Sequence, residues 1–244
     1  MKIIIIRHGD PDYAHDSLTE QGRREAVLLA KRLSSIRLDA IYCSPLGRAK
    51  LTASYTLAEK QLMAETCDWL REFAPEPICK AIGETDAADC VWDHLPEEWT
   101  ADERFFDLDR WTEGASLSGY NVKGEYKRVC RELDTLLAEH GYEREGRLYR
   151  AVRPSHDTVC FFCHFGVESV LLSHLLNMTP MQLWHGTCAL PTGVTTLVTE
   201  ERREGLAYWR MTGFGDVSHL TQAGLTPSRS ALFCECFTDP DRHD

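Results

Sequence analysis

The stretch that decides the fold reads KIIIIRHG and spans residues 2–9. Its four isoleucines are consecutive, so an extended chain places apolar side chains on both of its faces. Such runs are typical of strands in a parallel sheet that helices cover on both sides. Arg7, His8 and Gly9 follow at the carboxyl end of this predicted strand, where the ligand sites of open α/β sheets collect.

The next segments extend the same architecture. Thr19 is a candidate N-cap, and apolar residues recur at steps of three and four over 26–33, which predicts an amphipathic helix to about residue 36. A second apolar strand over 39–43 stops at Ser44-Pro45. Strand, helix and strand in this order indicate a βαβ unit and an α/β fold.

The remainder of the chain yields further elements and one irregular stretch. Residues 75–120 hold three of the six tryptophans, many acids and little periodicity, so they are interpreted as an insertion into one domain that spans 1–244. The other expected elements are a helix over 47–59, a third strand at 67–70, a helix over 122–140 ended by Gly141, a strand over 158–163, a helix over 167–176, and a hairpin of 194–199 with 206–211.

Composition excludes several classes of protein. The 244 residues include 38 acidic and 27 basic side chains, for a net charge of -11, so the chain lacks the basic stripe that nucleic acid or an anionic membrane requires. The apolar run at the N-terminus is too short for a signal peptide or a membrane span. We therefore expect a cytoplasmic protein whose ten cysteines are reduced thiols.

Basic side chains follow three of the predicted strands. Arg7 and His8 follow the first, Arg48 comes shortly after the second, and His164 follows the strand over 158–163. Together they would form a pocket for a doubly charged phosphoryl group, because the arginine fork matches phosphate oxygens and a neutral histidine can act as nucleophile.

The stretch CFFCH over 160–164 also matches the pattern of c-type haem attachment. Haem attachment needs export and an exposed loop, and neither is predicted here. Zinc is equally disfavoured, because two thiols three residues apart in a strand point to opposite faces and no second pair follows at metal spacing. We expect neither a metal nor a cofactor.

Taken in order, five motifs resemble the histidine phosphatase superfamily in its phosphoglycerate-mutase-like branch. They are RHG at 7–9, LTEQG at 18–22, SPLGRA at 44–49, His164 and FGDVSHL at 214–220. The resemblance implies a three-layer α/β sandwich with a central, mostly parallel sheet flanked by helices. It also implies that the 75–120 insertion forms a helical or loop cover over the site.

The resemblance further implies phosphoryl transfer through a phosphohistidine. His8 would attack phosphorus in line, while Arg7, Arg48 and His164 would hold the oxygens on which charge sits in the transition state. Glu72 occupies the place of the family's general acid, with Glu76 and Glu84 as alternatives. The residues expected to face the substrate are Gly9, Asp10, Tyr13 and Phe165.

Departures from the family pattern bear on the reaction. Ala14 stands where relatives often have a phosphate-binding Asn, Phe165 where Gly commonly follows the second His, and Gly215 where Asn is usual. After Glu72 the chain reads FAPEP, without the Glu-x-x-Tyr-Gly pattern with which mutases grip phosphoglycerate. The absence of this mutase pattern favours hydrolysis over isomerisation, so we expect metal-independent hydrolysis of a small phosphomonoester. A phosphoglycerate-mutase-type isomerase and a non-catalytic phosphate-binding module remain the alternatives.

The negative charge is concentrated in one segment. Residues 84–113 contain eleven acids and two bases, for a net charge of -9 that leaves only -2 for the rest of the chain. One interpretation is a solvated acidic surface. The other is an acidic cover that disfavours polyanionic substrates, because like charges at the mouth of a site hinder their approach.

Overall fold

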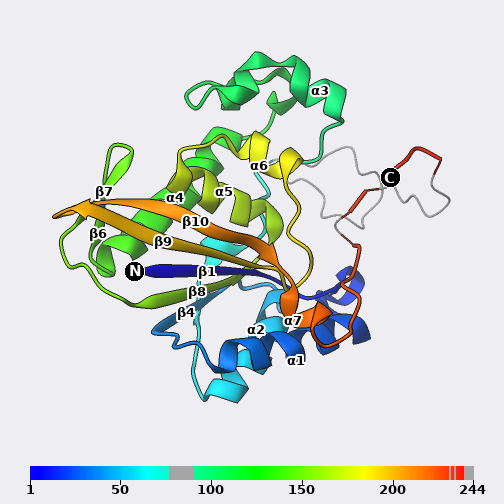
Figure 1. The fold of residues 1–244 in the computed structure, drawn as a ribbon. Coiled ribbons are helices and arrows are strands. Elements are labelled where there is room, and N and C mark those ends of the chain that lie inside the picture. Colours follow the sequence, from blue (N-terminus) through cyan, green and yellow to red (C-terminus); the bar gives the residue numbers. More distant parts are fainter. Residues whose placement is uncertain (77–90, 231, 234, 239–244) are drawn as a thin grey trace.

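A computed structural model of the chain describes residues 1–76, 91–230, 232–233 and 235–238 (Figure 1). Its central strand is β1 (Lys2–Arg7), which pairs in parallel with β8 (Thr158–Cys163) and antiparallel with β9 (Val194–Arg203). The four isoleucines alternate between two buried clusters, with Ile3 and Ile5 in one and their neighbours in the other. The prediction of a strand covered on both faces is confirmed.

The described residues form a small sheet of β2 (Pro11–Asp12) and β3 (Ser17–Leu18) and one eight-stranded sheet. In spatial order its strands are β5 (Glu65–Thr66), β4 (Ala40–Cys43), β8, β1, β9, β10 (Leu206–Asp216), β7 (Leu148–Ala151) and β6 (Tyr142–Glu145). The half from β5 to β1 is parallel, whereas the half from β1 to β6 is antiparallel. The α/β sandwich is confirmed, with a sheet that is mixed because the late hairpin β9–β10 returns beside β1.

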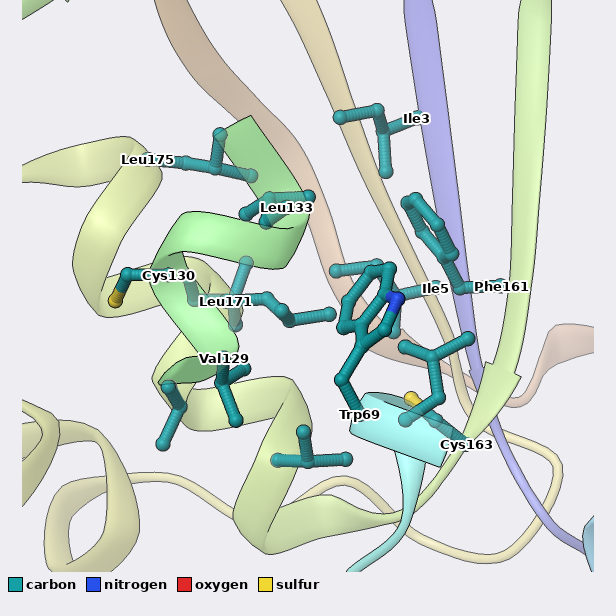
Figure 2. Packing of buried hydrophobic residues seen from close by; sticks show 14 of the residues in the cluster. Ile3, Ile5, Trp69, Val129, Cys130, Leu133, Phe161, Cys163, Leu171 and Leu175 are labelled. Carbon is teal, nitrogen blue, oxygen red and sulfur yellow. The ribbon is translucent and has the colours of Figure 1, made fainter. Parts of the chain in front are cut away.

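Helices cover both faces of the sheet, which gives three layers (Figure 1). On one face, α1 (Glu20–Ser34) and α2 (Gly47–Lys60) pack over the cluster that contains Ile4 and Ile6. On the other face lie α4 (Val122–Glu139) and α5 (Phe165–Leu176). Figure 2 shows their apolar side chains, with Trp69, packed against the strands.

Most predicted elements are present with shifted ends, and one is wrong. Thr19 caps α1, because its hydroxyl accepts from the Gly22 N–H. The predicted strand at 67–70 is instead a 3₁₀ turn over Asp68–Leu70 that follows the short β5. This turn buries both Trp69 and Leu70 in one cluster, whereas a strand would point consecutive side chains to opposite faces.

Several elements have weak sequence signals and were not predicted. They are the hairpin β6–β7, α3 (Pro96–Ala101), α6 (Pro180–Gly186) and α7 (Ser218–Thr221). Cys160 and Cys163 belong to opposite clusters, as their spacing in a strand requires. Among the described helices, none is both long and apolar enough to cross a bilayer.

Candidate active site

The carboxyl end of β1 delivers Arg7 and His8 to the edge of the sheet. The backbone N–H of His8 donates to the Cys163 carbonyl at 3.0 Å, and that of Gly9 donates to the Thr52 hydroxyl at 2.9 Å. A Cβ on Gly9 would stand 2.8 Å from the carbonyl oxygen of Gly22 in α1, so no side chain fits here. Close backbone packing therefore fixes where the His8 ring lies.

The His8 ring is buried in a defined tautomer. Its Nδ1 lies 2.8 Å from the Gly9 carbonyl oxygen, which can only accept, so Nδ1 carries the hydrogen. In the neutral ring Nε2 then has a free lone pair. Burial, with the positive charges of Arg7 and Arg48, holds the pKa of His8 well below its usual value, so the ring stays neutral.

His164 stands at the N-cap position of α5 and joins His8, with 5.1 Å between the ring centroids. Its Nε2 lies 2.8 Å from the Ser44 hydroxyl, which already accepts from the Leu46 N–H and so has its proton to donate. Nδ1 then carries the hydrogen. In the part of the chain that the structure describes, this buried Nδ1 has no partner, which leaves it available to an anion.

The two predicted arginines are buried with donors to spare. Arg7 Nη1 donates to the Ala189 carbonyl at 2.7 Å, and Arg48 lies over the Tyr13 ring at 5.4 Å. Among the described residues, the buried Nε of each arginine has no hydrogen-bond partner. Buried donors without partners are costly, so this group of cations is suited to an anion with several oxygens.

Asp16 is a residue of this site that the sequence did not reveal. Its Oδ1 accepts from Arg48 Nη1 at 2.8 Å, and its Oδ2 accepts from the Gly47 N–H at 2.6 Å. It therefore caps α2 from a distant segment and orients Arg48. Leu46, at the N-cap position of α2, has no side-chain acceptor. In the sequence, this missing acceptor is the one sign that a residue from another segment caps the helix.

Glu72 lies at the N-terminus of α5, on the same side of the pocket as His164. Its Oε1 accepts from the Phe73 N–H at 2.8 Å and the Val167 N–H at 3.0 Å. Burial raises its pKa, against the opposing effects of these N–H groups and of Arg48. Burial thus lets this carboxyl group hold its proton to higher pH than an ordinary glutamate does, as a general acid requires.

The remaining predicted site residues lie around this centre. Both carboxylate oxygens of Asp10 are engaged, by the hydroxyls of Thr19 and Ser228, and not by the arginines. Phe165 begins α5 and packs against the apolar core. The carbonyl of the exposed Glu76 accepts from the Asn121 N–H, and Glu84 lies outside the described residues.

The insertion reaches the site through Trp92. Its indole Nε1 donates to the Phe73 carbonyl at 3.2 Å, and a Cβ on Gly166 would lie 2.5 Å from Glu72 Oε1 and 3.1 Å from this nitrogen. Nearby, the His94 N–H donates to His185 Nε2 at 3.0 Å. These contacts join residues 92–94 of the insertion to Phe73, the neighbour of Glu72, and to α6.

The FGDVSHL motif at 214–220 contacts residues that hold the site, and not the catalytic side chains themselves. Asp216 pairs with Arg32 of α1 at 2.7 Å, and His219 Nε2 lies 3.1 Å from the Thr192 hydroxyl. The Thr192 N–H in turn donates to the His8 carbonyl at 3.1 Å. The motif thus anchors the loop that holds the backbone of His8.

The pocket therefore combines the unprotonated Nε2 of His8, hydrogen-bond donors on Arg7, Arg48 and His164, and the carboxyl group of Glu72, whose pKa is raised. In the described residues, no three His, Cys, Asp or Glu side chains converge to hold a metal ion. The arrangement is chemically suited to transfer a phosphoryl group to His8, with the arginines and His164 on its oxygens.

Several known proteins are similar to this chain in sequence. The chain is 24% identical over 235 residues to a probable phosphatase of Schizosaccharomyces pombe, covering 90% of this chain and 95% of that protein. It is 23% identical over 196 residues to the adenosylcobalamin/alpha-ribazole phosphatase of Escherichia coli, covering 76% and 84%.

Two solved structures have the same fold at low identity. A mycobacterial glucosyl-3-phosphoglycerate phosphatase superposes with a TM-score of 0.62 at 20% identity, covering 88% of this chain and 98% of that one. A phosphoserine phosphatase mutant of Entamoeba histolytica in complex with phosphoserine superposes with a TM-score of 0.59 at 21% identity. The match covers 90% of this chain and 98% of that one. Residues 3–212 match the family described as histidine phosphatase superfamily (branch 1), and the chain belongs to that superfamily.

Proposed function

We propose that this protein is a metal-independent phosphatase that hydrolyses a small phosphomonoester through a phosphohistidine on Nε2 of His8. The hydrogen bond from His8 Nδ1 to the Gly9 carbonyl carries the proposal, because it directs the free lone pair to the other nitrogen. Family membership and the phosphatases among the relatives support phosphatase activity.

In the first step, Nε2 of His8 attacks phosphorus in line and the ester P–O bond breaks. The Nε donors of Arg7 and Arg48, with Nδ1 of His164, are the buried donors available to the equatorial oxygens. They act on the charge that these oxygens carry in the transition state. Glu72 gives its proton to the leaving oxygen, so the alcohol departs neutral.

In the second step, water attacks the phosphohistidine. Glu72, now a carboxylate, accepts a proton from this water as the P–N bond breaks, which returns both residues to their starting states. Two N–H groups, of Phe73 and Val167, hold the carboxylate in place for both proton transfers. Inorganic phosphate then leaves the pocket.

A small substrate agrees with the structures that resemble this chain, one of which is a phosphoserine phosphatase bound to phosphoserine. The test is release of inorganic phosphate from an aryl phosphate and from a panel of small phosphorylated metabolites, without added metal. Turnover of at least one panel member is expected. Isomerisation of 3-phosphoglycerate stimulated by a bisphosphate, without net phosphate release, would favour a mutase instead.

A further inference from the structure

The first turn of α5 buries a carboxyl group that the proposed reaction does not use. Glu168 lies one helical turn after His164, and its backbone N–H donates to the His164 carbonyl at 2.9 Å. Its side chain is 0% exposed. A buried carboxyl group is costly unless it is hydrogen-bonded, paired or protonated, so its presence here needs a physical reason.

The surroundings of Glu168 hold little that would stabilise a charge. Among the described residues, no donor meets hydrogen-bonding geometry at either carboxyl oxygen. The Thr195 hydroxyl on β9 accepts from the Gly215 N–H at 3.0 Å, so its own proton remains free, and this hydroxyl lowers the pKa of the Glu168 carboxyl group. The titratable groups that face Glu168 are Arg7 on β1, Cys163 on β8 and Glu72.

Arg7 is the one cation among these neighbours, and it is also a phosphoryl ligand in the proposed reaction. Within the described ranges, its buried Nε has no hydrogen-bond partner, and neither do the carboxyl oxygens of Glu168. Burial raises the pKa of Glu168 to about 8, against the opposing effects of Thr195 and Arg7. Near neutral pH the carboxyl group is therefore mainly protonated and does not neutralise the charge of Arg7.

We propose that Glu168 is a positioning residue that couples proton binding to phosphate binding. In its neutral form it leaves the Arg7 guanidinium to the phosphoryl group, and in its ionised form it competes with the phosphoryl group for that guanidinium. The inference rests on the proposed function, because it requires a phosphoryl group beside Arg7.

The sign of the coupling follows from charge. A phosphate dianion in the pocket disfavours a second negative charge nearby, so binding raises the pKa of Glu168 further. Phosphate binding is therefore accompanied by proton uptake once the pH passes about 8, which is the pKa of Glu168 in the protein without phosphate. By linkage, the phosphate affinity of the wild type falls with rising pH, by at most about tenfold per pH unit for one coupled proton.

The test is titration calorimetry with inorganic phosphate, in buffers of different ionisation enthalpy, over a pH series that crosses 8. The Glu168→Gln variant keeps the shape of the neutral acid but cannot ionise. Relative to this variant, the wild type should take up about one more proton per phosphate at alkaline pH and lose affinity there, with equal affinities at lower pH. Equal proton uptake by the two proteins at every pH would overturn the proposal.

A second variant separates this coupling from a packing role. Thr195→Val removes the hydroxyl that stabilises the ionised form, so the extra proton uptake should begin at higher pH than in the wild type. An unchanged onset would contradict the proposal. Absence of phosphate binding at any pH in all three proteins would instead count against the proposed function, so the two failures are distinguishable.

Discussion

The proposed reaction requires His8 and Glu72 to be in opposite protonation states. His8 must lack a proton on Nε2, and Glu72 must keep its own. The same physical cause serves both, because burial disfavours charge: it lowers the pKa of the histidine and raises that of the carboxylic acid. The positive charges of Arg7 and Arg48 add to the effect on His8.

This argument predicts the pH dependence of turnover. Because Glu72 donates its proton, kcat should fall as the pH rises through the raised pKa of this group. Glu72→Gln should lower kcat/KM, which reports the phosphorylation step without the shared hydrolysis step, by about 10²- to 10⁴-fold for an alkyl phosphate and much less for an aryl phosphate, whose leaving group needs little protonation. Steady-state rates over a pH series measure both. Equal losses on the two substrates would exclude Glu72 as the acid.

Asp16 gives a second prediction at the scale of one residue. It caps α2 through the Gly47 N–H and holds Arg48. Asp16→Ala should lower the free energy of unfolding by about 1 kcal/mol, the typical cost of losing a cap, and raise KM. Asp16→Asn retains a capping oxygen and serves as the control in urea denaturation. Equal destabilisation by the two substitutions would contradict the capping role.

At the scale of elements, the N-terminus of α5 assembles His164, Glu72 and the indole of Trp92. Gly166→Ala should displace the flexible Glu72 carboxyl group, because the new Cβ would lie 2.5 Å from its Oε1. Alanine favours a helix, so the protein should unfold no more easily while kcat falls by about 10²-fold. Gly186→Ala in α6, where the Cβ meets nothing within 4 Å, is the matched control and should leave kcat unchanged.

Sequence periodicity predicted some elements of the fold and missed others. Consecutive buried isoleucines predicted a strand covered on both faces, because the period of the side chains leaves no alternative. The turn that buries Trp69 and the edge hairpin β6–β7 carry no such periodicity, so only packing defines them. Likewise Arg7, His8, Arg48, Glu72 and His164 were predicted as one site, whereas Asp16 joins that site only through contacts between distant segments.

At the scale of the whole molecule, the acid-rich segment 84–113 reaches the site through Trp92. Of the acids in 84–113, Glu84, Asp86 and Asp89 lie outside the described residues, while Asp102 pairs with Arg104 at 2.6 Å. Trp92, at the start of the described part, lies beside Glu72. We propose that residues 91–113 of this segment cover the pocket and disfavour polyanionic substrates.

The proposed acidic cover predicts a salt effect. At low salt, kcat/KM for a monoester with a neutral remainder should exceed that for a bisphosphate, and added salt should narrow the difference because it screens the repulsion. The measurement compares both substrates at low and high ionic strength. The same salt response for both would favour the solvated-surface interpretation.

The central claim concerns one nitrogen atom, so the most direct measurement traps the intermediate. Protein mixed with a phosphate-labelled substrate and quenched within one turnover should carry an acid-labile, base-stable label on Nε2 of His8. His8→Ala should carry no label and should not turn over. A label on another residue, or normal turnover by His8→Ala, would contradict the mechanism.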